Sequence, residues 1–165
     1  MPTGGIKMFR ELVRKNKQMP HEECIELLKT EKRGVVSVLG DNDYPYGTPM
    51  NHWYNEEDGC IYFHCGKGGH RTESLQKHDK VSFCVFNQGV REEGEWAYKV
   101  KSVIVFGKME IIEDKETIID ITTKLSLKFT GDVEYIKKEI ENHLHRTLLL
   151  KLTPEHICGK NVVES

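Results

Sequence analysis

The sequence lacks the features that mark several large classes of protein. None of its apolar runs approaches the roughly 20 residues that a helix needs to cross a bilayer, and its first residues lack the hydrophobic core of a secretion signal. Basic residues are not in excess, because 24 Lys and Arg stand against 26 Asp and Glu and the formal net charge is -2. We therefore expect a cytoplasmic protein whose partners include neither a membrane nor a nucleic acid.

Cysteine is scarce and scattered, which argues against two further classes. There are five cysteines, an odd number, and no two of them form a C-x-x-C pair. Without a secretion signal this pattern does not indicate a disulfide framework. His64 and Cys65 are adjacent in a predicted strand and so point to opposite faces, which argues against a zinc site there. We expect no bound metal.

Two nucleotide-binding motifs and an obvious catalytic pair are also missing. The glycine-rich stretch at 66–69 is not closed by Lys-Ser or Lys-Thr, so it is not a Walker A loop, and it lacks the G-x-G-x-x-G spacing. Glu73 and Asp79 have the sequence context of ordinary surface carboxylates. No acid–base pair stands out, and the catalytic residues stay unassigned.

What is present fits one mainly β domain spanning residues 1–165. A short helix begins near Pro20, and a helical pair with 3.6-residue spacing covers 114–145. Residues 1–18 form a basic arm, and 146–165 form the last strand and tail. The strands, which alternate with a period of two, are predicted at 35–39, 46–54, 60–65, 80–87, 98–113 and 147–152.

Hairpin turns between the first three strands indicate antiparallel pairing. Pro49 interrupts the second strand and demotes it to a sheet edge or a bulge. Apolar residues on both faces of the strand at 98–113 predict burial on both sides. Six strands with few helices between them favour a small antiparallel barrel, closed or partly open, with the helical pair plugging or flanking it.

The most informative segment runs from a strand through a glycine-rich turn into a helix. The strand at 61–65 is followed by Gly66, Gly68 and Gly69, and a helix is predicted from Thr72. Glycine lets the main chain approach a ligand closely, and free N–H groups at a helix start favour anions. His70 and Arg71 would add charge there. An ordinary strand-to-helix connection would have the same pattern.

Other strands carry polar side chains where a barrel core would not select them. Asn51, His64 and Ser102 can bond the edge of a heteroaromatic ring, and Trp53 and Phe63 offer flat apolar area. With the anion-binding turn, this set describes a site for a phosphorylated aromatic cofactor. Each residue taken alone has an ordinary structural explanation, and His64 in particular is typical of a satisfied strand-end histidine.

Four segments in this order resemble one family. They are Gly47-Thr48-Pro49-Met50-Asn51, then Tyr62-Phe63-His64-Cys65-Gly66 with Gly69-His70-Arg71, then the stretch 101–107, and last Ile157-Cys158-Gly159-Lys160. From about Cys24 to Lys160 the chain resembles the FMN-binding split-barrel family, the pyridoxamine 5'-phosphate oxidase-like group. Within that group it resembles more narrowly the branch that includes nitroimidazole-resistance proteins.

The resemblance implies a six-stranded antiparallel split β-barrel with FMN bound at the interface of a homodimer. Met50 and Asn51 would line the edge of the isoalloxazine ring, and His70 and Arg71 would hold the phosphate. Lys160 would approach the flavin, from the same chain or from the partner subunit. The full set of cofactor-binding residues that it implies is Pro49, Met50, Asn51, His52, Phe63, His64, Cys65, His70, Arg71, Ser102 and Lys160.

The implied activity is that of an oxidoreductase moving electrons from a reduced carrier to a small acceptor such as a nitro compound or a quinone. The flavin would carry the chemistry, which agrees with the missing acid–base pair. The chain lacks the arginine-rich C-terminal segment of the true oxidase, which argues against pyridoxamine phosphate as substrate. Two alternatives stay open: a non-catalytic flavin-binding or sensing module, and a haem-binding split barrel with His64, His70 or His156 as axial ligand.

Overall fold

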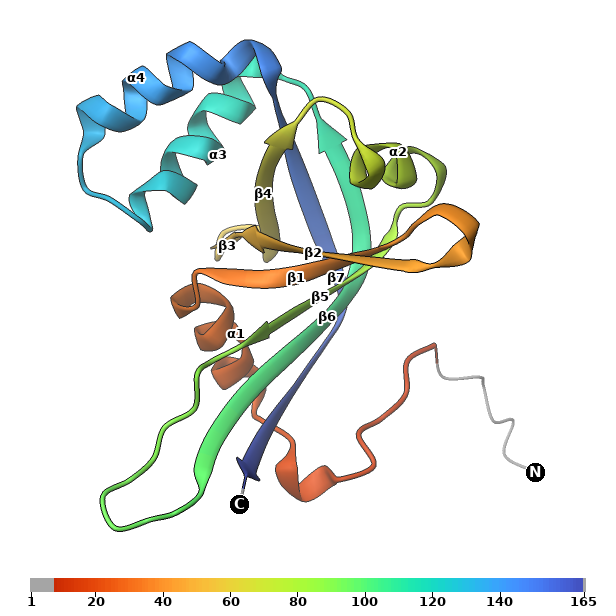
Figure 1. Cartoon of the computed structure of the whole chain (residues 1–165), viewed down its shortest axis with the longest axis vertical. Helices are drawn as coiled ribbons and strands as arrows, with labels where there is room; N and C mark the ends of the chain where they lie inside the picture. The colour runs from red at the N-terminus through yellow and green to blue at the C-terminus, as the bar shows by residue number, and fades with distance from the viewer. Residues whose placement is uncertain (1–7, 165) are drawn as a thin grey trace.

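The computed structural model describes residues 8–164, and within this range seven strands form one antiparallel sheet in the order β2-β1-β5-β6-β7-β4-β3 (Figure 1). The strands are β1 (Arg33–Leu39), β2 (Pro45–Asn51), β3 (Trp53–Asn55), β4 (Cys60–Gly66), β5 (Lys80–Phe86), β6 (Tyr98–Ile112) and β7 (Thr147–Glu164). The α-helices are α1 (His21–Thr30), α2 (His70–Lys77), α3 (Lys115–Leu127) and α4 (Val133–His143).

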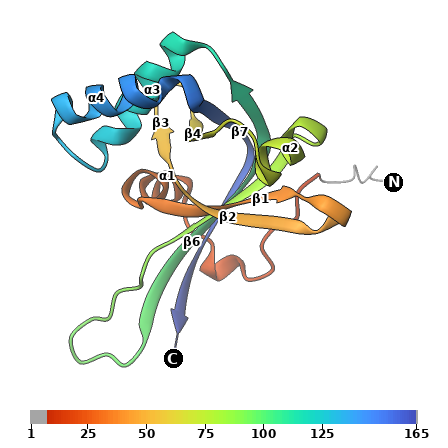
Figure 2. The same cartoon turned by 45° about the horizontal axis from the view of Figure 1, so that its top comes forward.

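The sheet is strongly curled, and its two longest strands, β6 and β7, pair with each other in its interior (Figure 1). Both views place α3 and α4 together on one side of the sheet, and α2 with the tip of the β1–β2 hairpin on the other (Figure 2). The predicted mainly β, antiparallel and partly open barrel with flanking helices is confirmed. No helix among residues 8–164 is both long and apolar enough to cross a membrane.

The strand count differs from the predicted six because the second predicted strand, 46–54, breaks at His52. Its first part, β2, pairs with β1 at one edge of the sheet, and its second part, β3, pairs with β4 at the opposite edge. A single residue therefore connects the two edges of the curled sheet. The expectation from Pro49 is confirmed, because β2 is an edge strand.

The main core lies inside the curl, where alternate residues of each strand point. Val36, Phe63, Phe83, Val103 and Leu150 are fully buried there. The helix α1 closes this core with its apolar side, whose buried residues are Cys24, Leu27 and Leu28. A second apolar cluster lies between α3 and the other face of β4 and β7; its members are Cys60, Tyr62, Ile118, Ile121 and Leu149.

The outer face of β6 is more open than the sequence suggested. Ile104 and Phe106 are 41% and 40% exposed, so the prediction that much of this strand is buried on both sides is wrong. The apolar residues on that face are not covered by a helix. Near the bulge between Phe106 and Gly107, a Cβ on Gly107 would collide with the Thr153 carbonyl oxygen, so β6 and β7 need glycine there.

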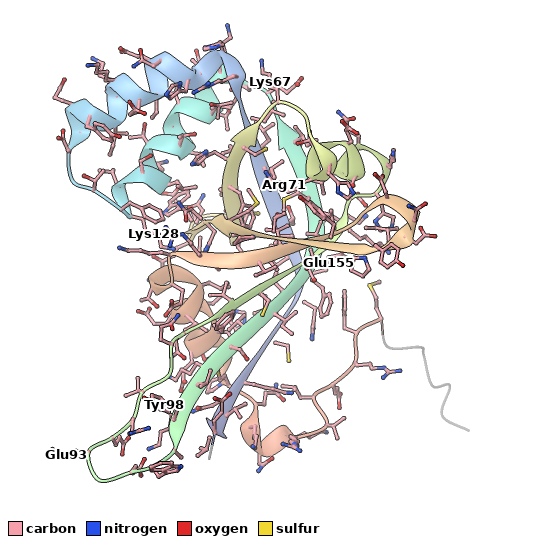
Figure 3. All side chains as sticks on the ribbon, viewed as in Figure 1. Lys67, Arg71, Glu93, Tyr98, Lys128 and Glu155 are labelled. Carbon is pink, nitrogen blue, oxygen red and sulfur yellow. The ribbon has the colours of Figure 1, made fainter. Side chains whose placement is uncertain are left out.

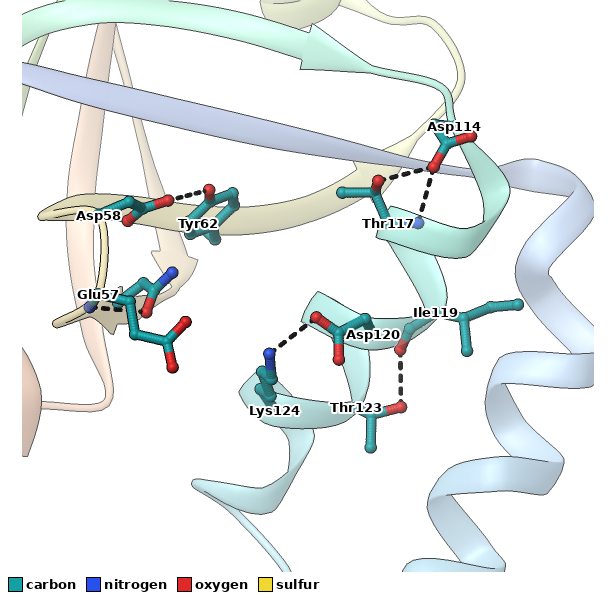
Figure 4. Close-up of polar contacts among 10 residues, drawn as sticks. Glu57, Asp58, Tyr62, Asp114, Thr117, Ile119, Asp120, Thr123 and Lys124 are labelled. Carbon is teal, nitrogen blue, oxygen red and sulfur yellow. Dashed lines mark hydrogen bonds and ion pairs between the residues drawn. The ribbon is translucent and has the colours of Figure 1, made fainter.

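Asp114 and Asp132 start the helical pair as N-caps. The Oδ2 of Asp114 accepts hydrogen bonds from the Thr117 backbone N–H at 2.9 Å and from its hydroxyl at 2.6 Å (Figure 4). Asp132 accepts from the Tyr135 backbone N–H at 3.0 Å. The two helices fall within the predicted range 114–145, whereas the predicted last strand and tail form one continuous strand, β7.

The N-terminal arm crosses the outer face of β6 and β7. The ring of Phe9 stacks on His156 at a centroid distance of 4.9 Å and on Phe106 at 5.7 Å. Farther along, Gln18 forms an isolated bridge to Lys160. Residues 1–7 of the predicted arm lie outside the described residues.

Candidate functional site

The glycine-rich turn between β4 and α2 lies open at the surface. A Cβ built on Gly66, Gly68 or Gly69 would meet no atom within 4 Å. Gly68 has φ +104°, and Gly69 has φ 94° and ψ 169°, a combination that only glycine adopts readily. The Lys67 backbone N–H donates to the Arg146 carbonyl at 3.2 Å and ties the turn to the start of β7. The turn therefore holds a defined shape while its main chain stays accessible.

The helix α2 begins at His70, two residues earlier than predicted, directly after this turn. Its N-cap is Gly69, which offers no side chain to cap the first backbone N–H groups. Such N–H groups and the positive end of the helix dipole favour an anion. The uncapped start and the open glycines lie side by side, so a ligand can reach both.

Arg71 adds a guanidinium group to this helix start and lies between α2 and β2 (Figure 3). Its Nη1 donates to the Thr48 hydroxyl at 3.1 Å, and its Nε is buried without a partner. The Thr72 hydroxyl, on the next residue, is also buried and unpaired. A guanidinium has five N–H donors and one is used here, so the donor set suits a phosphate group.

His70, the first residue of α2, contacts the β1–β2 hairpin. The Asp41 backbone N–H donates to its Nε2 at 3.1 Å, and its ring packs on Tyr46 at a centroid distance of 4.1 Å. The Asp41 carboxylate lies 3.7 Å from the same nitrogen. In this arrangement His70 holds the β1–β2 hairpin against α2, next to Arg71.

A depression of about 640 Å³ adjoins the turn, and both share Gly66 and Lys67. His64 projects into it from the face of β4 that α3 and α4 flank. The surrounding protein removes part of the hydration of His64, and this desolvation lowers the pKa of its imidazole. The remaining lining residues are Cys65, His143, Arg146 and Thr147.

His143 and Arg146 are oriented toward each other at the rim of this depression. An Arg146 guanidinium nitrogen donates to His143 Nδ1 at 2.8 Å, and His143 Nε2 lies 3.5 Å from a Glu139 carboxylate oxygen. The depression therefore has a basic mouth, formed by Arg146 and Lys67, next to the glycine-rich turn. Figure 3 shows Lys67 at the crest of this turn.

The predicted site residues fall into separate groups in the chain. His64, His70 and Arg71 lie at or beside the turn. Met50, His52, Phe63 and Cys65 point into the core. Pro49 and Asn51 lie on the outer face of the edge strand β2, where Asn51 accepts a hydrogen bond from Arg33. Ser102 and Lys160 are register partners on the outer face of β6 and β7.

Two of these placements correct the sequence-based assignment. His52 and Phe63 are fully buried, so neither offers surface to a cofactor bound outside the core. His52 was assigned from its position in a polar motif, but its Nε2 lies 2.7 Å from the Leu28 carbonyl and its ring packs on Phe83 at 4.9 Å. These contacts within the core give His52 a structural role.

Four residues at the site were not assigned from the sequence: Thr48, Lys67, His143 and Arg146. Thr48 lies inside the first of the four quoted segments and Lys67 lies in the glycine-rich stretch 66–69, so their place in the sequence could have identified them. The other two come from the end of α4 and the residues before β7, far along the chain. Only the fold brings that segment beside the glycine turn.

The fold and the site together define a class: a partly open antiparallel barrel whose strand-to-helix turn leaves an uncapped helix start next to the Arg71 guanidinium. A family model described as pyridoxamine 5'-phosphate oxidase matches residues 20–161. The chain belongs to this family. A search of curated proteins gave no match.

Solved structures share the fold at low sequence identity. A candidate 5-nitroimidazole antibiotic resistance protein from Bacteroides thetaiotaomicron is 19% identical with a TM-score of 0.73, over 89% of this chain and 87% of that one. A FAD-binding protein from Mesorhizobium loti is 19% identical with a TM-score of 0.63, over 88% and 97%. A FAD-binding protein from Mycobacterium smegmatis is 17% identical with a TM-score of 0.62, over 90% and 99%. The resemblance to the split-barrel family is thereby confirmed.

Proposed function

We propose that the protein is a homodimeric flavoprotein that binds FMN and transfers electrons from a reduced carrier to a small acceptor. The observation that carries the proposal is the open turn at Gly66–Gly69. It combines an uncapped helix start with the partly unpaired guanidinium of Arg71. Flavin-binding proteins among the structures of the same fold support the cofactor class.

The terminal phosphate of FMN would bind at the turn. Arg71 would donate to phosphate oxygens while its Nη1 keeps the bond to Thr48, and the first backbone N–H groups of α2 would supply further donors. The hydroxyl of Thr48 is itself a donor group and lies at the same place. A phosphate carries close to two negative charges at neutral pH, so one guanidinium and a helix start match it well.

The remainder of the cofactor would extend toward the depression beside the turn. When bound, the isoalloxazine ring supplies the redox chemistry, and the protein orients it and tunes its surroundings. His64 enters the depression from β4 with a lowered pKa, so its neutral ring can donate one hydrogen bond and accept another at pH 7. Lys67 and Arg146 make the mouth positive, which favours an anionic ligand.

A second copy of the chain would pack on the outer face of the sheet. Large apolar side chains are exposed to solvent on this face and on the adjoining loop: Phe86 is 51% exposed, Trp96 81% and Tyr98 42%. Arg91 stacks on both Trp96 and Tyr98, at 5.6 Å and 4.6 Å from the ring centroids. Aromatic residues with an arginine are enriched at protein interfaces.

A nitro compound or a quinone is the proposed acceptor, and the structural likeness to a candidate nitroimidazole-resistance protein supports the first of these. Consumption of the reduced carrier in the presence of each acceptor, measured under anaerobic conditions, separates this enzyme from a non-catalytic flavin carrier.

Replacing Arg71 by Ala tests the phosphate site. Losing a charge-assisted hydrogen bond to a phosphate should weaken FMN binding by roughly tenfold to a hundredfold. The free energy of unfolding should fall by only about 1 kcal/mol, because the bond to Thr48 is the one side-chain hydrogen bond that Arg71 forms among residues 8–164. Fluorescence titration with FMN and urea unfolding measure the two quantities. Lys138→Ala, which removes an exposed cation on α4, is the matched control.

Equal losses of FMN affinity and folding stability in Arg71→Ala would refute the phosphate assignment. The chromophore of the purified protein should be released and identified by chromatography, which separates FMN from FAD. A flavin spectrum excludes the haem alternative, whereas a Soret band would replace the flavin proposal with it.

A further inference from the structure

A small pocket of about 160 Å³ lies between the helical pair and the sheet. It adjoins the depression beside the glycine-rich turn, because both are lined by His64, His143 and Thr147. The helix α3 lines the pocket with residues four positions apart, which share one face of a helix. These residues are Ile118, Thr122 and Ser126, and the end of α4 adds Glu139, Ile140 and Leu144.

The hydroxyl of Thr122 is the observation that points to a ligand. Thr122 is 9% exposed, and its Oγ1 is buried without a hydrogen-bond partner among residues 8–164. On the next residue of the same helix, the Thr123 hydroxyl donates to the Ile119 carbonyl one turn back, at 2.7 Å (Figure 4). Thr122 does not form the corresponding bond. A buried hydroxyl without a partner costs free energy, and a ligand in the pocket would supply the partner.

The volume of the pocket limits the size of the ligand. A cavity of about 150 Å³ holds one benzene ring. The sites of drug-sized molecules and cofactors begin at about 300 Å³. A single six-membered ring therefore fits, whereas a flavin or a purine nucleotide does not. The apolar surface that such a ring needs comes from Ile118, Ile140 and Leu144.

The charge in the pocket favours a neutral ligand. Glu139 is the one acidic residue of the lining, and its carboxylate lies 3.5 Å from His143 Nε2. Arg146 donates to Nδ1 of the same ring, so the proton of the neutral ring is on Nε2 and faces this carboxylate. No Lys or Arg of residues 8–164 lines the pocket. An anionic ligand would therefore meet the Glu139 carboxylate without a cation to balance it.

The polar groups of the pocket can both donate and accept hydrogen bonds. The hydroxyls of Thr122 and Ser126 do so from α3, and the neutral imidazole of His64 does so from β4. Because these groups come from two walls, the ligand needs polar atoms at two positions of its ring. A quinone has two carbonyls, and its hydroquinone has two hydroxyls. Groups that donate and accept therefore suit both oxidation states of this pair.

We propose that this pocket binds a monocyclic quinone and its hydroquinone and is the acceptor site of the flavoprotein. One ligand oxygen bonds to the Thr122 hydroxyl, and the other bonds to the His64 ring. The role as acceptor site rests on the proposed function, since a quinone takes up two electrons and two protons to become the hydroquinone and the reduced flavin supplies both. Binding of the ring itself does not depend on the flavin.

Hydroquinone is the probe, and anaerobic conditions prevent its oxidation during the titration. The backbone amide signals of the protein, followed by NMR, should show saturable shifts confined to α3, α4 and the end of β4. Phenol lacks one of the two hydroxyls and should bind about fivefold more weakly. Benzoate carries a negative charge on a ring of the same size and should not saturate.

Thr122→Val replaces the unpaired hydroxyl by a methyl group and should weaken hydroquinone binding about fivefold. The urea midpoint of this variant should stay equal or rise, because no hydrogen bond is lost in the free protein. Thr123→Val makes the same change on the next residue of α3, outside the pocket lining, and is the matched control. Its hydroquinone affinity should differ from that of the wild type by less than about twofold.

The acceptor role is tested by turnover, in which Thr122→Val should raise the KM for benzoquinone about fivefold and leave the KM for the reduced carrier unchanged. Arg71→Ala should lose FMN affinity and keep hydroquinone affinity, so a failure of the flavin proposal and a failure of this one give different results. The binding site is overturned if hydroquinone does not saturate, if phenol or benzoate binds equally well, or if Thr123→Val matches Thr122→Val. A lower urea midpoint in Thr122→Val would make its hydroxyl a structural group, and an unchanged KM for benzoquinone would overturn the acceptor role.

Discussion

Acid should destabilise this protein through His52, whose ring is sealed in the core. The ring is fully buried between Phe83 and Phe63, and its Nε2–H donates to the Leu28 carbonyl at 2.7 Å. The other nitrogen, Nδ1, is buried without a partner, so a proton placed there would gain no hydrogen bond. Desolvation, aided by the nearby Lys128 ammonium, lowers the pKa of His52 from 6.5 to about 3.

The size and sign of the effect follow from this shift. Below pH 6.5 His52 becomes protonated in the unfolded chain, whereas in the folded chain it stays neutral until the pH falls to about 3. The unfolded state therefore binds more protons, and the free energy of unfolding falls as the pH falls through this window. Between pH 7 and pH 4.5 the loss from this residue is about 2.5 kcal/mol.

His52→Gln isolates this contribution, because glutamine can still donate to the Leu28 carbonyl but does not titrate. Urea unfolding at pH 7 and pH 4.5 gives the loss of stability for each protein, and the titration of carboxylates cancels in the difference. The wild type should lose about 2.5 kcal/mol more than the variant. His145→Gln, at an exposed position, should behave as the wild type. Equal losses in wild type and His52→Gln would show that the ring is protonated in the folded protein and would refute the core assignment.

Two further predictions concern the turn and the strand before it. His64→Ala should shift the flavin absorption bands or the rate of flavin reduction while FMN affinity changes by less than about threefold, since His64 lines the depression and not the helix start; an unchanged spectrum and unchanged rates would remove His64 from the site. Gly69→Ala should lower the free energy of unfolding by about 1–3 kcal/mol and weaken FMN binding, because φ 94° and ψ 169° strain any other residue. Gly131→Ala is the control, because a Cβ on Gly131 would meet no atom within 4 Å. Urea unfolding measures the loss of stability in each variant, and FMN titration measures the loss of affinity.

The sequence predicted the strands well because their alternation is local. Val35 to Leu39, Lys80 to Phe86 and the long strand from Tyr98 all form where the period of two indicated. The break at His52 was missed, since Tyr46 to Tyr54 has continuous strand character. Only pairing with β1 on one side and β4 on the other shows that the chain changes edges there.

The candidate site was predictable where a single segment builds it. The glycine turn and Arg71 are contiguous, and glycine is required by the backbone angles found at Gly68 and Gly69. His52 was misassigned because a buried histidine and a ligand-binding histidine have the same sequence context. Ser102 was expected near the flavin phosphate and Lys160 near the flavin, and the register of β6 and β7 places the two side by side on the outer face of the sheet.

The way the sheet ends limits how copies of this chain can associate. At one edge, β2 carries Pro45 and Pro49, which have no N–H to offer an incoming strand. At the other edge, β3 is three residues long. Short and proline-bearing edges protect a sheet from continuous strand addition and aggregation. Growth into an extended intermolecular sheet is therefore blocked at both borders, and self-association is directed to side-chain contacts between faces.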